Sequence, residues 1–132
     1  MGLASACTLF VCTSCRPPEC PREPKEQRPG FLLFHRLAKL IDEGYISNEI
    51  ELKAAECLSL CPRPCGIALS SPGSWTYLFG DQDPKQSPKE ILDCVSSYIE
   101  KPEGQLPRAS RPPGLRSNIL GRVPPPSLLV SK

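Results

Sequence analysis

Residues 56–65 read ECLSLCPRPC and carry three thiols at four-residue intervals, at Cys57, Cys61 and Cys65. A helix would bring thiols with this spacing onto one face, but Pro62 and Pro64 each remove a backbone donor. Proline also pushes the preceding residue toward extended geometry, which disfavours a helix through this segment. The segment is therefore predicted to be a rigid, irregular loop that directs its cysteines toward one centre.

A second pair of thiols, Cys12 and Cys15, follows the apolar run 8–11. Residues 7–12 (CTLFVC) form a short run that contains β-branched and aromatic side chains, which favours a buried strand that ends at Cys12. The carboxyl end of a strand is where α/β sheets usually carry their chemistry. Together the two segments supply enough sulfur for a site with four thiolate ligands.

The prolines are unevenly placed along the chain. Of 132 residues, 17 are proline, and most lie in 16–30 and 101–126. We expect one domain over 7–100, with a mobile proline-rich loop at 16–29 and a Pro/Arg-rich C-terminal tail at 101–132. A core of this size is only marginally stable through burial of apolar side chains alone. A bound metal centre would add to its stability.

Charge and composition narrow the class of protein. The net charge is +2, and the sequence has no basic stripe interleaved with aromatics, so nucleic-acid binding is not expected. No apolar run approaches the roughly 18 residues of a membrane helix. The N-terminus lacks the basic region of a secretion signal. We therefore expect a protein of the reducing cytoplasm. In that compartment, clustered thiols such as those among its eight cysteines are more often ligands or redox groups than disulfides.

Periodicity predicts the middle of the chain. Apolar residues at helical spacing predict an amphipathic helix over 30–43, which Gly44 ends. Residues 49–55 alternate apolar with charged side chains, which predicts a half-buried strand. This strand delivers Cys57 at its end.

A hairpin and a second helix are predicted after the cysteine loop. Runs 67–69 and 75–79 read as strands, joined by a turn that contains Pro-Gly. Ser87-Pro88-Lys89-Glu90 is typical of a capped helix start, and an amphipathic helix follows it.

Three other candidate ligands are assigned to different roles. His35 falls on the polar side of the first helix and is expected to be solvated. It is the single histidine, which excludes a Rieske-type centre, because that centre needs two. Cys94 lies beside the apolar stripe of the second helix and is expected to be a small core residue. Cys20, in the polar loop, is expected to be an exposed thiol.

The order strand, helix, strand, cysteine loop, hairpin, helix predicts an α/β thioredoxin-like sandwich, with a mixed sheet of about four strands and two main helices. From Cys57 to the closing helix, the chain resembles the second half of the thioredoxin-like [2Fe-2S] ferredoxins. It is still more similar to a family of small bacterial proteins predicted to bind metal, a domain of unknown function within that ferredoxin group. The matching stretches are 9–16, 56–65, 73–81 and 121–124.

The resemblance implies a ligand set. In those ferredoxins the C-x-x-x-C pair supplies two cluster ligands, which implies Cys57 and Cys61 here. Cys12 is the next ligand that the resemblance implies, because it closes the first strand. Cys15 is preferred over Cys20 as the fourth ligand because it matches the closer family. Cys65 is left as a fifth or exchangeable ligand. The spacing of Cys12 and Cys15 is narrower than is usual for these ferredoxins, so Cys20 stays an alternative to Cys15.

The expected function is that of an iron-sulfur electron-transfer or metal-binding protein with a [2Fe-2S] cluster and an unidentified redox partner protein. A four-cysteine zinc site is the alternative, since both metals accept four thiolates. A third hypothesis is a thiol-disulfide oxidoreductase that uses Cys12 and Cys15. No hydrolase or nucleotide-binding motif occurs, so an enzyme is not expected. Whether the chain forms a homodimer is left open.

Overall fold

The part of the chain that the structure describes folds around one five-stranded sheet with two α-helices. The computed structural model describes residues 7–14, 16, 19–20, 23–46, 50–56, 58 and 63–125. Its strands and α-helices are β1 (Cys7–Cys12), α1 (Pro29–Asp42), β2 (Ile50–Ala55), β3 (Ile67–Ser70), β4 (Thr76–Phe79), α2 (Pro88–Glu100) and β5 (Ile119–Val123). Short 3₁₀ helices lie at Lys25–Gln27, Pro102–Gly104, Arg108–Ser110 and Pro113–Leu115.

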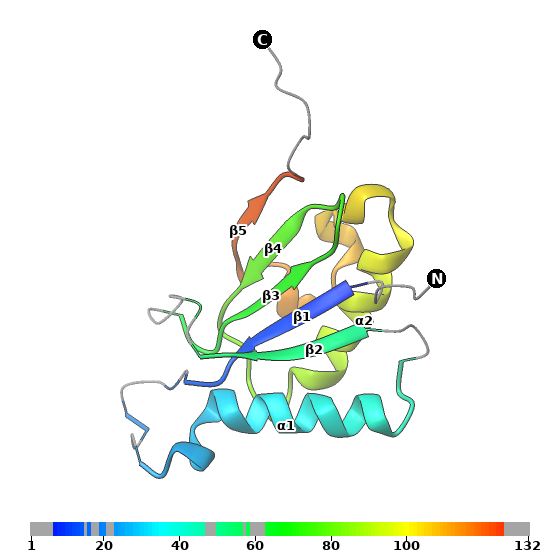
Figure 1. The fold of residues 1–132 in the computed structure, drawn as a ribbon. Helices are drawn as coiled ribbons and strands as arrows, with labels where there is room; N and C mark the ends of the chain where they lie inside the picture. The colour runs from blue at the N-terminus through cyan, green and yellow to red at the C-terminus, as the bar shows by residue number, and fades with distance from the viewer. Residues whose placement is uncertain are drawn as a thin grey trace.

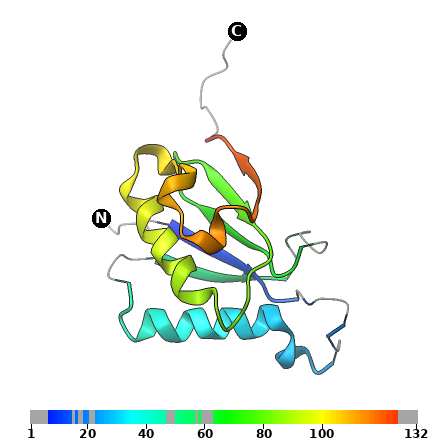
Figure 2. The same cartoon turned by 180° about the vertical axis from the view of Figure 1, so that it is seen from behind.

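The sheet is mixed, with strand order β2-β1-β3-β4-β5 (Figure 1). β1 pairs in parallel with β2 through the crossover helix α1, whereas the other neighbouring pairs are antiparallel. Both helices cover the same face, as the view from behind shows (Figure 2). Leu9 and Val11 point to that face and are fully buried, whereas Thr8 and Phe10, which alternate with them, are only partly buried. The predicted thioredoxin-like α/β fold is confirmed.

The helix α1 forms where the apolar period predicted it. Leu33 and Leu37 are fully buried against the sheet, and the polar side of the helix faces solvent. Gly44 adopts a positive φ of 85° directly after the helix. Its amide donates to Ile41 O at 3.1 Å, and the Tyr45 amide donates to Leu40 O at 3.0 Å, the bond pattern of a Schellman motif. The predicted role of Gly44 is confirmed.

The hairpin and the second helix also follow the sequence, with one correction. Ser71–Ser74 closes the β3–β4 turn with a 3.1 Å backbone bond, and Gly73 has the positive φ of 74° that a type II turn needs. α2 begins at Pro88 as expected, but Ser87 does not cap it. The Ser87 hydroxyl instead accepts the Asp83 amide at 2.8 Å, which stabilises the preceding turn.

The chain after residue 100 contains regular structure that the sequence did not predict. β5 pairs antiparallel with β4 and extends the sheet to a fifth strand. Two hydrogen bonds tie the segment between α2 and β5 to the sheet near β4. The Trp75 amide donates to Glu103 O at 2.8 Å, and the Leu106 amide donates to the Tyr77 hydroxyl at 2.8 Å. Prolines prevent a long helix here, yet two of the short 3₁₀ turns bury a residue, Gly104 in the first and Leu115 in the last.

No helix among the described residues is long and apolar enough to cross a bilayer.

We predict that the segment after α2 is part of the core and contributes to stability. Leu115 is 0% exposed, so Leu115→Ala should lower the free energy of unfolding by about 2–5 kcal/mol. Val123, in β5, is 51% exposed, so Val123→Ala should change it by about 0.5 kcal/mol or less. Urea unfolding of both variants checks this, and an equal, small loss in both would mean that residues 101–125 do not pack as described.

Candidate metal centre

Cys12 lies at the carboxyl end of β1, which is hydrogen-bonded between β2 and β3. Its amide donates to Gly66 O at 3.1 Å, and the amide of Thr13 donates to Ala55 O at 2.9 Å. The Cys12 side chain is 1% exposed, and its sulfur lies 3.9 Å from Glu56 O. Because these backbone bonds come from both sides, the sheet itself fixes the backbone position from which the Cys12 side chain extends.

Cys65 lies on the segment that leads back from the cysteine loop into β3. Its amide donates to Gln82 O at 3.3 Å, and the Gln82 amide donates back to Cys65 O at 3.1 Å. Two residues earlier, the Arg63 carbonyl accepts the Asp81 amide at 2.9 Å. These bonds pair the returning segment with the chain just after β4, and they leave Cys65 only 2% exposed.

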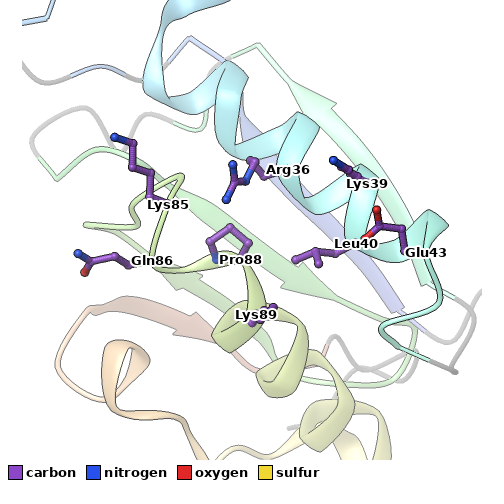
Figure 3. Close-up of a pocket in the computed structure, with 8 residues that line it drawn as sticks. All are labelled: Arg36, Lys39, Leu40, Glu43, Lys85, Gln86, Pro88 and Lys89. Carbon is purple, nitrogen blue, oxygen red and sulfur yellow. The ribbon is translucent and has the colours of Figure 1, made fainter.

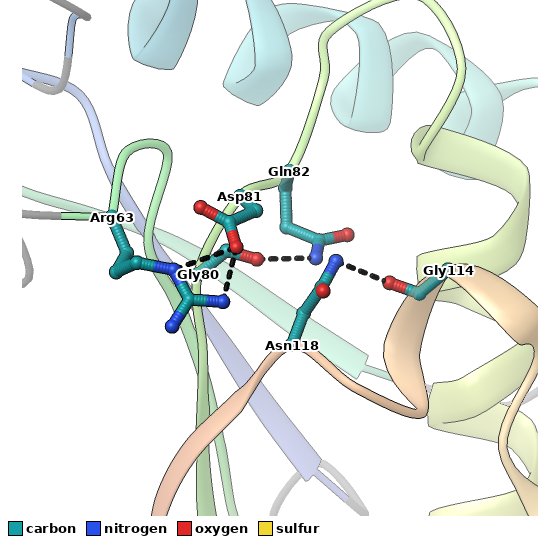
Figure 4. Close-up of polar contacts among 6 residues, drawn as sticks. All are labelled: Arg63, Gly80, Asp81, Gln82, Gly114 and Asn118. Carbon is teal, nitrogen blue, oxygen red and sulfur yellow. Dashed lines mark hydrogen bonds and ion pairs between the residues drawn. The ribbon is translucent and has the colours of Figure 1, made fainter.

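Side chains tighten this pairing. Arg63 donates Nε to Asp81 Oδ2 at 2.7 Å and forms an ion pair with the same carboxylate (Figure 4). Gln82 is buried and donates Nε2 to Gly80 O at 2.7 Å. A Cβ on Gly80 would lie 2.6 Å from Arg63 O, so a residue without a side chain is needed where the two segments cross.

Burial and neighbouring acidic groups both act on the pKa of the Cys65 thiol. Burial raises the pKa of Cys65 to about 12, and the negative charges of Cys12, Asp83 and Cys20 raise that pKa as well. Cys12 and Cys20, which are far apart along the chain from Cys65, therefore both lie near it in space. In this surrounding a thiolate is unfavourable unless a cation balances it, and a metal ion supplies such a cation.

Of the predicted ligands, the structure places Cys12 and Cys65 beside each other. Cys15, Cys57 and Cys61 lie outside the described residues. Within the part of the chain that is described, no three His, Cys, Asp or Glu side chains converge closely enough to hold a metal ion. The flanks of the cysteine loop are defined: Leu58 packs against the core after β2, and Arg63 begins the return.

The remaining candidates have different environments. Cys7 and Cys94 are 1% exposed within the core cluster, so Cys94 is a core residue as predicted. His35 is exposed on α1, as expected, with its ring 4.4 Å from that of Phe31. Cys20 is only partly exposed and lies near Cys65, so the exposed thiol that the sequence suggested is instead half-buried beside the candidate centre.

The residues that hold the cysteine loop in place were not found from the sequence. Gly80, Asp81 and Gln82 look like an ordinary turn after a strand, and Asp81 has a positive φ of 58°. Their partners, Arg63 and Cys65, are distant along the chain. The one available signal was the Gly-Asp pair that ends the stretch 73–81, which carried part of the family resemblance.

The chemistry of these donors fits a metal centre of the thiolate class. Cys12 and Cys65 bring two buried sulfurs to the end of β1, where backbone hydrogen bonds hold both residues. Sulfur donors suit iron-sulfur clusters and zinc, and they do not suit calcium or magnesium, which take oxygen.

Comparison with protein families gives one match over most of the chain. The model of the family described as "Protein of unknown function (DUF1636)" matches residues 9–125. This confirms the family resemblance drawn from the sequence. No curated protein sequence matches the chain.

Solved structures with the same fold include a thioredoxin-like [2Fe-2S] ferredoxin from Aquifex aeolicus. That structure is 18% identical with a TM-score of 0.58, and the match covers 96% of this chain and 100% of the ferredoxin. A second structure, of the wild-type ferredoxin, is 14% identical with a TM-score of 0.52, over 89% of this chain and 99% of the other. At these identities the similarity establishes the fold.

The contact at Gly80 gives a test of how the cysteine loop is held. We predict that Gly80→Ala costs about 1–3 kcal/mol, because the new methyl group collides with the Arg63 backbone. The Asp81 and Cys65 amides should then exchange hydrogen faster. Gly121→Ala is the matched control, since its Cβ would lie 3.7 Å from Leu78, an ordinary contact. Equal stability of the two variants, with unchanged exchange, would contradict this account.

A second prediction concerns the buried thiol of Cys94. Burial raises its pKa from 9.0 to about 12. Below pH 9 the thiol is protonated in both states, but above pH 9 only the unfolded chain loses the proton. Stability should therefore fall as the pH rises from about 9 toward 12, by about 1.4 kcal/mol per pH unit for this one thiol.

Urea unfolding at pH 8 and pH 10 measures this effect. Cys94→Ala should be the less stable protein at pH 8, because it leaves a small cavity. The difference between the two proteins should shrink at pH 10, because the variant has lost this titration. A difference that stays constant between the two pH values would show that Cys94 does not keep its proton in the folded state.

Proposed function

The chain belongs to the DUF1636 family, and from that premise we propose that it binds a [2Fe-2S] cluster and carries single electrons to and from a partner protein. The observation that carries the proposal is the burial of Cys12 beside Cys65 at the end of β1, where the cysteine loop is anchored. The shared fold with a ferredoxin that bears such a cluster supports it.

The proposed ligands are Cys57 and Cys61 from the loop and Cys12 from the end of β1. Cys15 is the fourth ligand in the closer family pattern, and Cys20 is the alternative because it lies near Cys65. Cys65 is proposed as a fifth thiol that can replace a lost neighbour. The described part of the site supports this set through two of its members, Cys12 and Cys65, and through the anchored flanks of the loop.

The protein's own residues would hold the cluster and shield it. The sheet fixes Cys12, and the Arg63–Asp81 ion pair with the Cys65–Gln82 bonds fixes the return of the loop. A [2Fe-2S] cluster accepts and releases one electron at a time. Burial around it limits access of water, which is one of the means by which a protein sets a reduction potential.

We propose a carrier and not an enzyme, because the sequence contains none of the motifs for hydrolysis or nucleotide chemistry. Zinc on the same thiolates is the competing occupant. A dithiol enzyme that uses Cys12 and Cys15 receives less support, because the first α-helix among the described residues, α1, begins only at Pro29, too far along the chain for its start to activate a thiol in this pair.

Anaerobic purification from iron-replete cells tests the proposal. The protein should be reddish-brown, with visible absorption that dithionite bleaches and with about two irons and about two sulfides per chain. Colourless protein that contains stoichiometric zinc would contradict the proposal and would indicate a zinc site on the same thiolates.

Cysteine variants with matched controls then assign the ligands. Cys57→Ser and Cys61→Ser should remove the metal and lower the melting temperature, because metal binding is coupled to folding. Cys7→Ala and Cys94→Ala are the controls and should keep it, since both side chains lie within the core. Comparison of Cys15→Ala with Cys20→Ala identifies the fourth ligand, since one of them alone should lose the metal.

A further inference from the structure

A pocket of about 420 Å³ lies between α1 and the start of α2, lined mainly by cations (Figure 3). α1 contributes Arg36 and Lys39, and the segment into α2 contributes Lys85 and Lys89. Apolar walls come from Leu40 and the buried Pro88. This pocket is lined by none of the cysteines and is separate from the candidate metal centre.

The charges around this pocket are unbalanced. Its lining holds four cations and a single carboxylate, that of Glu43, although the whole chain has 16 basic and 14 acidic residues. No carboxylate among the described residues forms an ion pair with any of the four cations. Lys89 lies 5.9 Å from the Tyr45 ring, and that contact does not cancel its charge.

The concave shape of this pocket suits a small anion better than it suits a large, flat partner. Figure 3 shows Arg36 pointing from α1 toward Pro88, and Lys85 and Lys89 line the pocket from the segment on that side. A concave site with apolar walls strengthens the field of the charges around it. The amino end of α2, which starts at Pro88, adds a partial positive charge.

We propose that this pocket binds a small, multiply charged oxyanion of the phosphate class, such as diphosphate or a phosphate ester. Arg36 offers the forked donors that pair with two oxygens of one phosphate group, and the lysines act as point charges around it. The volume is within the range of ordinary small-molecule sites and is too small for a folded partner. The inference does not depend on which metal the cysteines hold.

Isothermal titration calorimetry with sodium diphosphate at low salt tests the proposal on the full chain. The wild type should bind one diphosphate saturably, with an affinity that falls as salt is added. Arg36→Gln with Lys85→Gln should weaken binding about tenfold or more, because two charge-assisted contacts are lost. Glu43→Gln should strengthen binding, because the repelling carboxylate is removed.

The control removes the same charge elsewhere. Lys25→Gln with Lys101→Gln lowers the net charge equally at two exposed positions outside the pocket, and should leave the affinity within about twofold. All these positions are exposed, so the variants should fold, which circular dichroism checks. Absence of saturable binding, or an equal loss in both double variants, would overturn the proposal. So would a polyglutamate peptide that binds this face more tightly than diphosphate, since that would indicate a protein-docking surface.

Discussion

The hydrogen bonding of β1 to strands on both sides is the constraint on which the rest of the molecule depends. The register pairs Leu9 with Leu52 in β2 and with Leu69 in β3, which aligns apolar side chains beneath both helices. A shift by one residue would turn these side chains to the open face. The same register ends β1 at Cys12, so the fold of the core and the position of the first sulfur are set together.

Burial and charge act against each other at the end of β1. The hydrophobic surroundings that hold Cys12 and Cys65 also make the ionised Cys65 thiol costly. If they remain protonated, these thiols act only as small apolar side chains of the core, as Cys94 does. Coordinated to a metal, the same thiols are deprotonated and paired with positive charge, and the enclosure then contributes to binding. Burial of the two thiols thus disfavours their ionised form when no cation is bound, and a bound metal ion removes that cost.

The sequence was sufficient wherever structure follows from local period. α1 and the hairpin needed only the spacing of apolar residues, Gly44 and a Pro-Gly turn. β5 was missed because Gly121 and flanking prolines weaken its strand signal, and its stability comes from pairing with β4. Within the candidate site, the placement of Cys12 at a strand end could be predicted. The pairing of Cys65 with Gln82 could not, because it joins distant segments, and the ligand set itself stays a prediction.

The pairing of β4 with β5 also affects how the chain is made. Strands β1 to β4 and both helices precede β5 along the chain, so during synthesis on the ribosome they emerge before it. Until Ile119–Val123 emerges, the outer backbone groups of β4 lack their partner strand, and such an edge can pair with another chain. The 3₁₀ turns between α2 and β5 would already lie over Tyr77 and Tyr98 at that stage. Nascent chains of this protein are therefore most exposed to mispairing after β4 has emerged and before β5 has, when most of the sheet is present and one edge is still open.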